Sequence, residues 1–128
     1  MYPNDLRYTS EHEWARVQQD GTAVVGITTY AQDELGDIVF VDLPKVGTQF
    51  KQFAKFGEIE SVKTVSDLFL PVGGEVVEVN EKLRKQPELV NKDPYGEGWI
   101  VKVKTADAAQ AAKLMSAEEY ERTLGRPH

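Results

Sequence analysis

The feature that most constrains the fold is a short sequence pattern that occurs twice. Residues 36–41 and 74–79 each contain a glycine, an acidic residue and three apolar positions, at an offset of 38 residues. A second pair of segments, 56–62 and 97–103, matches at an offset of 41. Repeated strand patterns at a nearly constant spacing predict two related halves of one β-sandwich. Convergent strand composition is the alternative, because such patterns arise easily in β-proteins.

Alternating apolar residues between turn residues predict a mainly β chain with short helices. The strands that we expect are residues 13–18, 22–28, 37–43, 48–53, 56–62, 65–72, 75–79 and 99–104. A helix is predicted at 29–35, with Thr29 as N-cap, Gln32 three residues later and Gly36 as the stop. A second short helix is expected after Asn80.

The chain length predicts a single domain. Its 128 residues suffice to bury a hydrophobic core without disulfides. We expect the core at about 6–104 and a helical C-terminal segment at about 105–125, since 107–115 is alanine-rich and Ser116 with Glu119 forms a capping box. The helices should pack on the sheets through Leu114, Tyr120 and Leu124.

Composition excludes several classes of function. The chain has no cysteine, and 15 basic against 21 acidic residues give a net charge of −6. This charge argues against nucleic acid and anionic membranes as partners, and the lack of a leader or an apolar run predicts a cytoplasmic protein. His12 and His128 have no partner at metal-ligand spacing, so no metal site is expected. Without a cysteine nucleophile, a plausible serine–histidine–acid set or a phosphate-binding glycine loop, we do not expect an enzyme.

Lys63 is the candidate functional residue. It falls between the strands predicted at 56–62 and 65–72, where a hairpin turns, and no other basic residue lies between Lys55 and Lys82. A hairpin tip exposes a side chain on a rigid stem, which suits covalent loading by one enzyme and delivery to others. A plain surface lysine in an unmodified β-sandwich interaction module is the alternative.

The flanking residues favour one kind of carrier. Biotin carriers place methionine on both sides of the lysine, whereas the neighbours here are Val62 and Thr64. Glu60 lies three residues before Lys63, as a glutamate does in lipoyl-bearing domains. Further motifs are HEW at 12–14, GITTYAQDELGDIVFVDLP at 26–44, VGTQF at 46–50, ESVKTVSD at 60–67, GEVVEVNE at 74–81 and DPYGEGW at 93–99. In these motifs the sequence resembles the glycine cleavage system H-protein family over nearly its whole length.

The resemblance implies both a fold and a function. The fold would be a barrel-sandwich hybrid of two quasi-repeated antiparallel halves, as in lipoyl and biotinyl carriers, with a C-terminal helical extension. Lys63 would carry lipoic acid in amide linkage. The chain would shuttle the aminomethyl group of glycine from the pyridoxal-phosphate enzyme glycine decarboxylase to a tetrahydrofolate-dependent aminomethyltransferase. It would then present the dithiol to the FAD enzyme dihydrolipoamide dehydrogenase, so it would be a substrate of these enzymes and of a lipoylating enzyme.

The resemblance also indicates which residues would serve the arm. Glu13 is the candidate carboxylate for the cationic amine of a sheltered arm, and the helix at 29–35 would be the second wall of the cleft. Some family members have a histidine where this chain has Glu34, and a second acid would also suit a cation. The residues expected to guide lipoylation are Glu60, Ser61, Val62, Thr64, Ser66 and Asp67. A relay of lipoyl groups to 2-oxoacid dehydrogenase complexes would use the same lysine and stays open.

Overall fold

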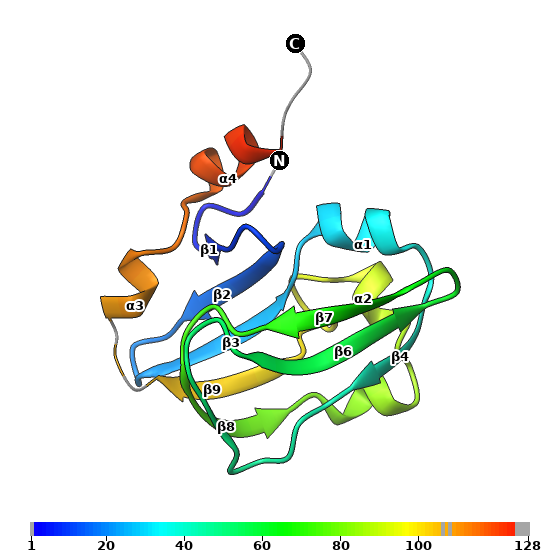
Figure 1. The fold of residues 1–128 in the computed structure, drawn as a ribbon, viewed down its shortest axis with the longest axis horizontal. Coiled ribbons are helices and arrows are strands. Elements are labelled where there is room, and N and C mark those ends of the chain that lie inside the picture. The colour runs from blue at the N-terminus through cyan, green and yellow to red at the C-terminus, as the bar shows by residue number, and fades with distance from the viewer. Residues whose placement is uncertain (1, 106, 108, 125–128) are drawn as a thin grey trace.

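The chain forms two antiparallel sheets. The computed structural model describes residues 2–105, 107 and 109–124. The larger sheet contains, in spatial order, β1 (Arg7–Tyr8), β2 (Glu13–Val17), β3 (Thr22–Ile27), β9 (Val101–Thr105), β8 (Gly74–Val79) and β5 (Gln49–Phe50). The smaller sheet contains β4 (Ile38–Asp42), β6 (Lys55–Ser61) and β7 (Val65–Phe69), as Figure 1 shows. The mainly β, two-sheet architecture expected from the sequence is confirmed.

Short helices connect and flank the sheets. They are α1 (Thr29–Leu35), the 3₁₀ helix η1 (Glu81–Arg84), α2 (Leu89–Lys92), α3 (Ala109–Ala112) and α4 (Ala117–Thr123). The Ser116–Glu119 capping box before α4 is confirmed, with both reciprocal hydrogen bonds present. The short helix α2 is not predicted from the sequence, because its four residues are too few to show the apolar periodicity of a helix. Among the described residues, no helix has the length and apolar character needed to cross a membrane.

The internal repeat corresponds to two equivalent strand pairs, one in each sheet. β4 pairs with β6, and β8 pairs with β9; the register shifts at Ile38/Phe40 in the first pair and at Val76/Glu78 in the second. These irregularities fall at matching positions of the repeat. The match between segments 56–62 and 97–103 is one residue off, however. In the two ladders, Val41 pairs with Ile59 and its repeat counterpart Val79 pairs with Val101, so Val101 is the structural equivalent of Ile59. The sequence match gives Ile100 instead. A slip of one residue would turn every side chain to the opposite face.

The hairpin that carries Lys63 stays within one sheet. Because the repeated segments lie on either side of Lys63, the repeat also predicts that this hairpin crosses from one half of the sandwich to the other. That prediction is wrong, since β6 and β7 pair with each other, from Lys55 with Phe69 to Glu60 with Val65. The chain changes sheets later, between Phe69 and Gly74. Pro71 lies in this connection and cannot donate a ladder hydrogen bond, so the strand ends there. The strand predicted at 65–72 is therefore shorter than expected.

Two other predicted boundaries are also corrected. Thr28, not Thr29, is the N-cap of α1, because its hydroxyl accepts the amide hydrogen of Ala31. Thr29 instead bonds to the Tyr95 hydroxyl, with its amide nitrogen 3.0 Å from that oxygen. The strand predicted at 48–53 is reduced to the two residues of β5, since Phe53 adopts a left-handed backbone conformation that a strand cannot contain.

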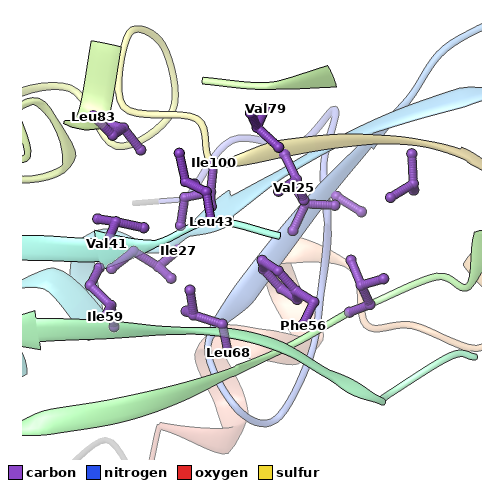
Figure 2. Close-up of a cluster of buried hydrophobic side chains, with 14 of the residues drawn as sticks. Val25, Ile27, Val41, Leu43, Phe56, Ile59, Leu68, Val79, Leu83 and Ile100 are labelled. Atoms are coloured by element: carbon purple, nitrogen blue, oxygen red, sulfur yellow. The ribbon is translucent and has the colours of Figure 1, made fainter. Parts of the chain in front are cut away.

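The main hydrophobic core lies between the two sheets. Figure 2 shows Phe56, Ile59 and Leu68 of the smaller sheet facing side chains of the larger sheet, such as Val25 and Val79. All of these side chains are buried. The core therefore fixes the smaller sheet, and with it the lysine hairpin, against the larger one.

A second cluster attaches the C-terminal helix. It contains Tyr8, Trp14 and Tyr120, and the rings of Tyr8 and Tyr120 stack with their centroids 4.9 Å apart. The predicted packing of Leu114 and Tyr120 is confirmed, since both are buried, and Leu124 packs against the edge of this cluster. The C-terminal segment is thus part of the domain.

The base of the hairpin yields a testable prediction about stability. A Cβ on Gly57 would collide with the backbone oxygen of Asp42 on β4, which cannot move without breaking the ladder. Gly57→Ala should lower the free energy of unfolding by about 1–3 kcal/mol. Urea denaturation measures this, with Val77→Ala on an exposed position of β8 as control. Equal stability of the Gly57→Ala protein and the wild type would contradict the close approach.

Candidate functional site

Lys63 lies at the tip of the β6–β7 hairpin, as the sequence predicts. The turn is held by Ser61, whose hydroxyl oxygen accepts the amide hydrogens of Lys63 and Thr64 at 3.2 and 3.1 Å. The Val62 amide donates to the carbonyl of Asp37 at 3.0 Å, which ties the tip to the segment that follows α1. Figure 1 shows this segment passing beside the tip. The backbone is therefore fixed while the Lys63 side chain is exposed.

The residues around Lys63 differ in accessibility. Those that are exposed are Glu60, Val62, Thr64, Ser66 and Asp67. Ser61 is buried, with 5% of its surface exposed, and its hydroxyl is occupied by the turn. On the outer side of the hairpin, the Lys55 ammonium lies 2.7 Å from the Glu58 carboxylate and 3.2 Å from that of Asp67. Ser61 thus holds the turn in shape, whereas the exposed residues form the surface around Lys63 that another protein can contact.

An open hollow runs beside β7. It has a volume of about 410 Å³ and is lined by Glu11, His12, Ala31, Glu34, Leu35, Val65, Ser66, Asp67 and Phe69. One wall is α1 and the other is β7, so the helix lies where the prediction for residues 29–35 places it, and its role in sheltering an arm stays a prediction. Glu34 lies on this wall and is exposed. The hollow begins close to the attachment candidate, because Val65 is two residues after Lys63.

A second hollow continues from the first and contains Glu13. It has a volume of about 400 Å³ and is lined by Thr9, Ser10, Glu11, Glu13, Phe53 and Phe69. Glu11 and Phe69 line both hollows, so the two adjoin. We call the first the outer hollow, the second the inner hollow, and both together the hairpin cleft. The four residue steps from Val65 to Phe69 span about 13 Å of strand, well beyond the reach of an unmodified lysine.

The carboxyl group of Glu13 is buried, and each of its oxygens accepts one hydrogen bond. Only 2% of Glu13 is exposed. The Thr9 hydroxyl donates to one carboxyl oxygen at 2.6 Å, and the Phe69 amide donates to the other at 3.1 Å. Burial raises the pKa of Glu13 to about 7, although these two hydrogen bonds lower it. The group therefore changes its charge near neutral pH, and a cation placed beside it would favour the ionised form.

His12 connects the cleft to the C-terminal helix. Its Nδ1 lies 2.7 Å from the Tyr120 hydroxyl, which is also 2.8 Å from Oγ1 of Thr28, the N-cap of α1. Burial lowers the pKa of His12, while the carboxylates of Glu11 and Glu34 act in the opposite direction. His12 has a φ of 73°, a conformation that residues other than glycine rarely adopt.

Several cleft residues escape sequence reasoning. Thr9, Phe53 and Phe69 line the cleft, and none of them lies in a recognisable local motif for this role. Tyr120 reaches His12 across 108 positions of sequence. Only HEW at 12–14 gave a signal, and that signal came from resemblance. Within the described part of the chain, no group of three or more ionisable ligands is arranged to hold a metal ion.

Comparison with known proteins identifies the family. The family model described as glycine cleavage H-protein matches residues 6–126. The chain belongs to the glycine cleavage H-protein family. Members of this family are carriers, not catalysts, and bear a covalently attached lipoate on a lysine.

Individual relatives agree with this assignment. The glycine cleavage system H protein of Bacteroides thetaiotaomicron is 60% identical over 119 residues, covering 93% of this chain and 94% of that protein. The H protein of Halothermothrix orenii is 58% identical over 122 residues, covering 95% and 94%. The crystal structure of the H protein from Mycobacterium marinum superimposes with a TM-score of 0.90 at 41% identity, covering 98% of this chain and 100% of that chain. The similarity thus includes both the fold and the full length.

The raised pKa of Glu13 predicts a pH-dependent stability. Because the folded-state pKa is about 7 and the ordinary value is 4.5, folding is favoured while the carboxyl stays protonated, and this advantage is lost as pH rises from about 4.5 to about 7. Relative to Glu13→Gln, the wild type should lose on the order of 3 kcal/mol of unfolding free energy over this range. Urea denaturation of both proteins at several pH values measures the difference. A difference that stays constant with pH would contradict the assignment.

Proposed function

We propose that Lys63 is the lipoyl attachment residue through which this chain serves as the carrier of the glycine cleavage system. The observation that carries the proposal is the position of Lys63. Its backbone is fixed by Ser61 and Asp37, its side chain is exposed, and it lies at the mouth of a cleft that ends in a buried carboxyl group. Such a lysine is accessible to a modifying enzyme, and an arm attached to it has a place to retract.

The residues present fit a lipoyl arm. Leu35, Val65 and Phe69 give the cleft apolar walls for a hydrocarbon chain, and Glu13 gives it a polar end. When bound, lipoate supplies a dithiolane that opens to accept the aminomethyl group and is later reoxidised, a sulfur chemistry that the cysteine-free chain lacks. The chain's own residues tether this group, shield it from water and hold its cargo.

Glu13 suits a cargo that carries a positive charge. A primary ammonium in the inner hollow would stabilise the ionised carboxylate, so its arrival would lower the pKa of Glu13 and its departure would restore it. A relay of lipoyl groups to 2-oxoacid dehydrogenase complexes requires no carboxylate at this position. The inner hollow therefore favours glycine cleavage over the relay, and over an unmodified interaction module.

The lipoylating enzyme would contact the exposed residues of the hairpin. Glu60, Val62 and Thr64 present charge, apolar surface and a hydroxyl around Lys63. Ser66 and Asp67 also line the outer hollow, so they are available to both the enzyme and the retracted arm. Ser61 would contribute indirectly, by holding the turn in a shape that presents Lys63.

The partners follow from the family. A member of this family works with the other components of the glycine cleavage system. We propose as partners the glycine decarboxylase, the aminomethyltransferase and the dihydrolipoamide dehydrogenase of that system, besides the lipoylating enzyme. A cytoplasmic location stays a prediction from the sequence.

The attachment site is tested by Lys63→Arg. Arginine keeps the positive charge and the exposed position but cannot form the amide, so the variant should fold normally, gain no lipoyl mass and lose carrier activity to background. Intact mass spectrometry and glycine cleavage reconstituted with the partner enzymes measure both effects. Lys45→Arg, another exposed lysine, is the control. Carrier activity in Lys63→Arg would refute the assignment.

The role of Glu13 is tested on the loaded carrier. Glu13→Gln keeps the shape of the side chain but removes the negative charge that would hold the amine. Loss of the aminomethyl group to water should speed up roughly tenfold, as expected for one lost charge-assisted hydrogen bond, whereas lipoylation should be unchanged. Mass spectrometry of the loaded protein over time measures the decay. An unchanged decay rate would remove Glu13 from the model of the cleft.

A further inference from the structure

Phe53 combines two unusual properties at the end of the cleft. Its backbone has a φ of 66°, in the left-handed region that favours glycine. Among the described residues, only His12 shares this property without being glycine. Phe53 also exposes 53% of its surface, although it is large and apolar. An unfavourable backbone that presents an aromatic ring to solvent indicates a role other than packing.

The backbone around Phe53 is held firmly. Phe53 donates its amide hydrogen to the carbonyl of Leu70 at 2.7 Å, and Leu70 donates to Ala54 at 3.0 Å. Ala54 in turn donates to Lys51 at 3.1 Å. These bonds fasten the turn between β5 and β6 to the end of β7, so the position of the Phe53 Cα is determined. The ring, in contrast, is exposed over about half of its surface, with 53% of Phe53 exposed.

The ring lies at a boundary of the inner hollow. Phe53 lines the inner hollow together with Glu13 and Phe69. It also lines a neighbouring side hollow of about 270 Å³, together with Lys113 and Met115. Thr9 and Ser10 are the only other residues that line both. Phe53 therefore lies where the inner hollow meets the side hollow, and it does not line the outer hollow.

We propose that Phe53 is an aromatic gate that positions a primary ammonium group against Glu13. This inference rests on the proposed function, in which the cargo of the arm is an amine. A carboxylate flanked by two aromatic rings, Phe53 and Phe69, combines ion pairing with attraction of the cation to the ring faces. The Phe53 ring also restricts the access of water to the carboxyl group, which strengthens the ion pair.

The surrounding charges agree with a cation as the guest. The ionisable groups that line the inner hollow are Glu11 and Glu13, both acidic. Lys113 lines the side hollow and does not line the inner hollow. The described residues that line the inner hollow thus contribute carboxylates and no basic side chain, which suits a cationic guest.

Binding of methylammonium to the unmodified chain tests the gate without lipoate. Methylammonium chloride is titrated against sodium chloride at equal ionic strength, and the NMR resonance of the Phe69 amide, which bonds to Glu13, reports occupancy. The wild type should respond and Glu13→Gln should not. Phe53→Gly and Phe53→Asn, which both tolerate the left-handed conformation, should bind about two- to fivefold more weakly, as expected for one lost cation–π contact.

Stability separates this role from a structural one. Because both substitutions relieve an unfavourable backbone and remove an exposed ring, the variants should be at least as stable as the wild type in urea denaturation. Phe40→Ala is the matched control, since Phe40 is also 53% exposed but does not line the cleft. It should bind methylammonium as the wild type does. In the loaded carrier, Phe53→Gly should shorten the lifetime of the aminomethyl group.

The outcomes distinguish the gate from the proposed function. A wild type that gives no response to methylammonium would overturn the role of Glu13 and, with it, the gate. A wild type that binds methylammonium while both Phe53 variants bind equally well would overturn the gate alone. Phe53 variants that unfold more readily than the wild type would contradict the backbone strain from which the inference starts.

Discussion

The hydrogen bond between the Glu13 carboxylate and the Phe69 amide joins the two sheets at the cleft. Glu13 belongs to β2 of the larger sheet, and Phe69 ends β7 of the smaller sheet. The same carboxyl group accepts the Thr9 hydroxyl, so a single buried acid organises the inner hollow. Its burial costs stability, because an ionisable group is removed from water. A core that served packing alone would have an apolar side chain in the place of Glu13.

The rest of the cleft is assembled from segments that are distant in sequence. Its walls come from the turn before β2, from α1, from the turn before β6 and from β7. The C-terminal helix contributes through Tyr120, which contacts both His12 and the N-cap residue of α1. Aromatic packing of Tyr120 against Tyr8 holds that helix in place. Tyr120, which lines neither hollow, thus supports His12 and α1, which line the outer hollow.

The sequence predicts the strands, the hairpin tip and the helical wall, because each depends on local patterns: alternation, glycine and proline at turns, and caps. It places the N-cap of α1 one residue late, since Thr28 and Thr29 are chemically alike and only the contact of Thr29 with Tyr95 separates them. The sequence also matches β6 to β9 with an error of one residue, because the register of each strand depends on its pairing with a neighbouring strand. Thr9, Phe53 and Phe69 could not be predicted as neighbours of Glu13, since tertiary packing alone brings them together.

The anchoring of the hairpin tip has a consequence for encounters with partners. Ser61 and the contact of Val62 with Asp37 hold the backbone at Lys63, so the tip is a fixed pivot. If Lys63 carries the arm, as we propose, only that side chain has to search for a partner's active site, because its point of attachment does not move. A partner that docks on this surface loses little free energy to ordering of the carrier's backbone. One rigid surface would then serve each of the proposed partner enzymes in turn, because all of them would capture the same arm.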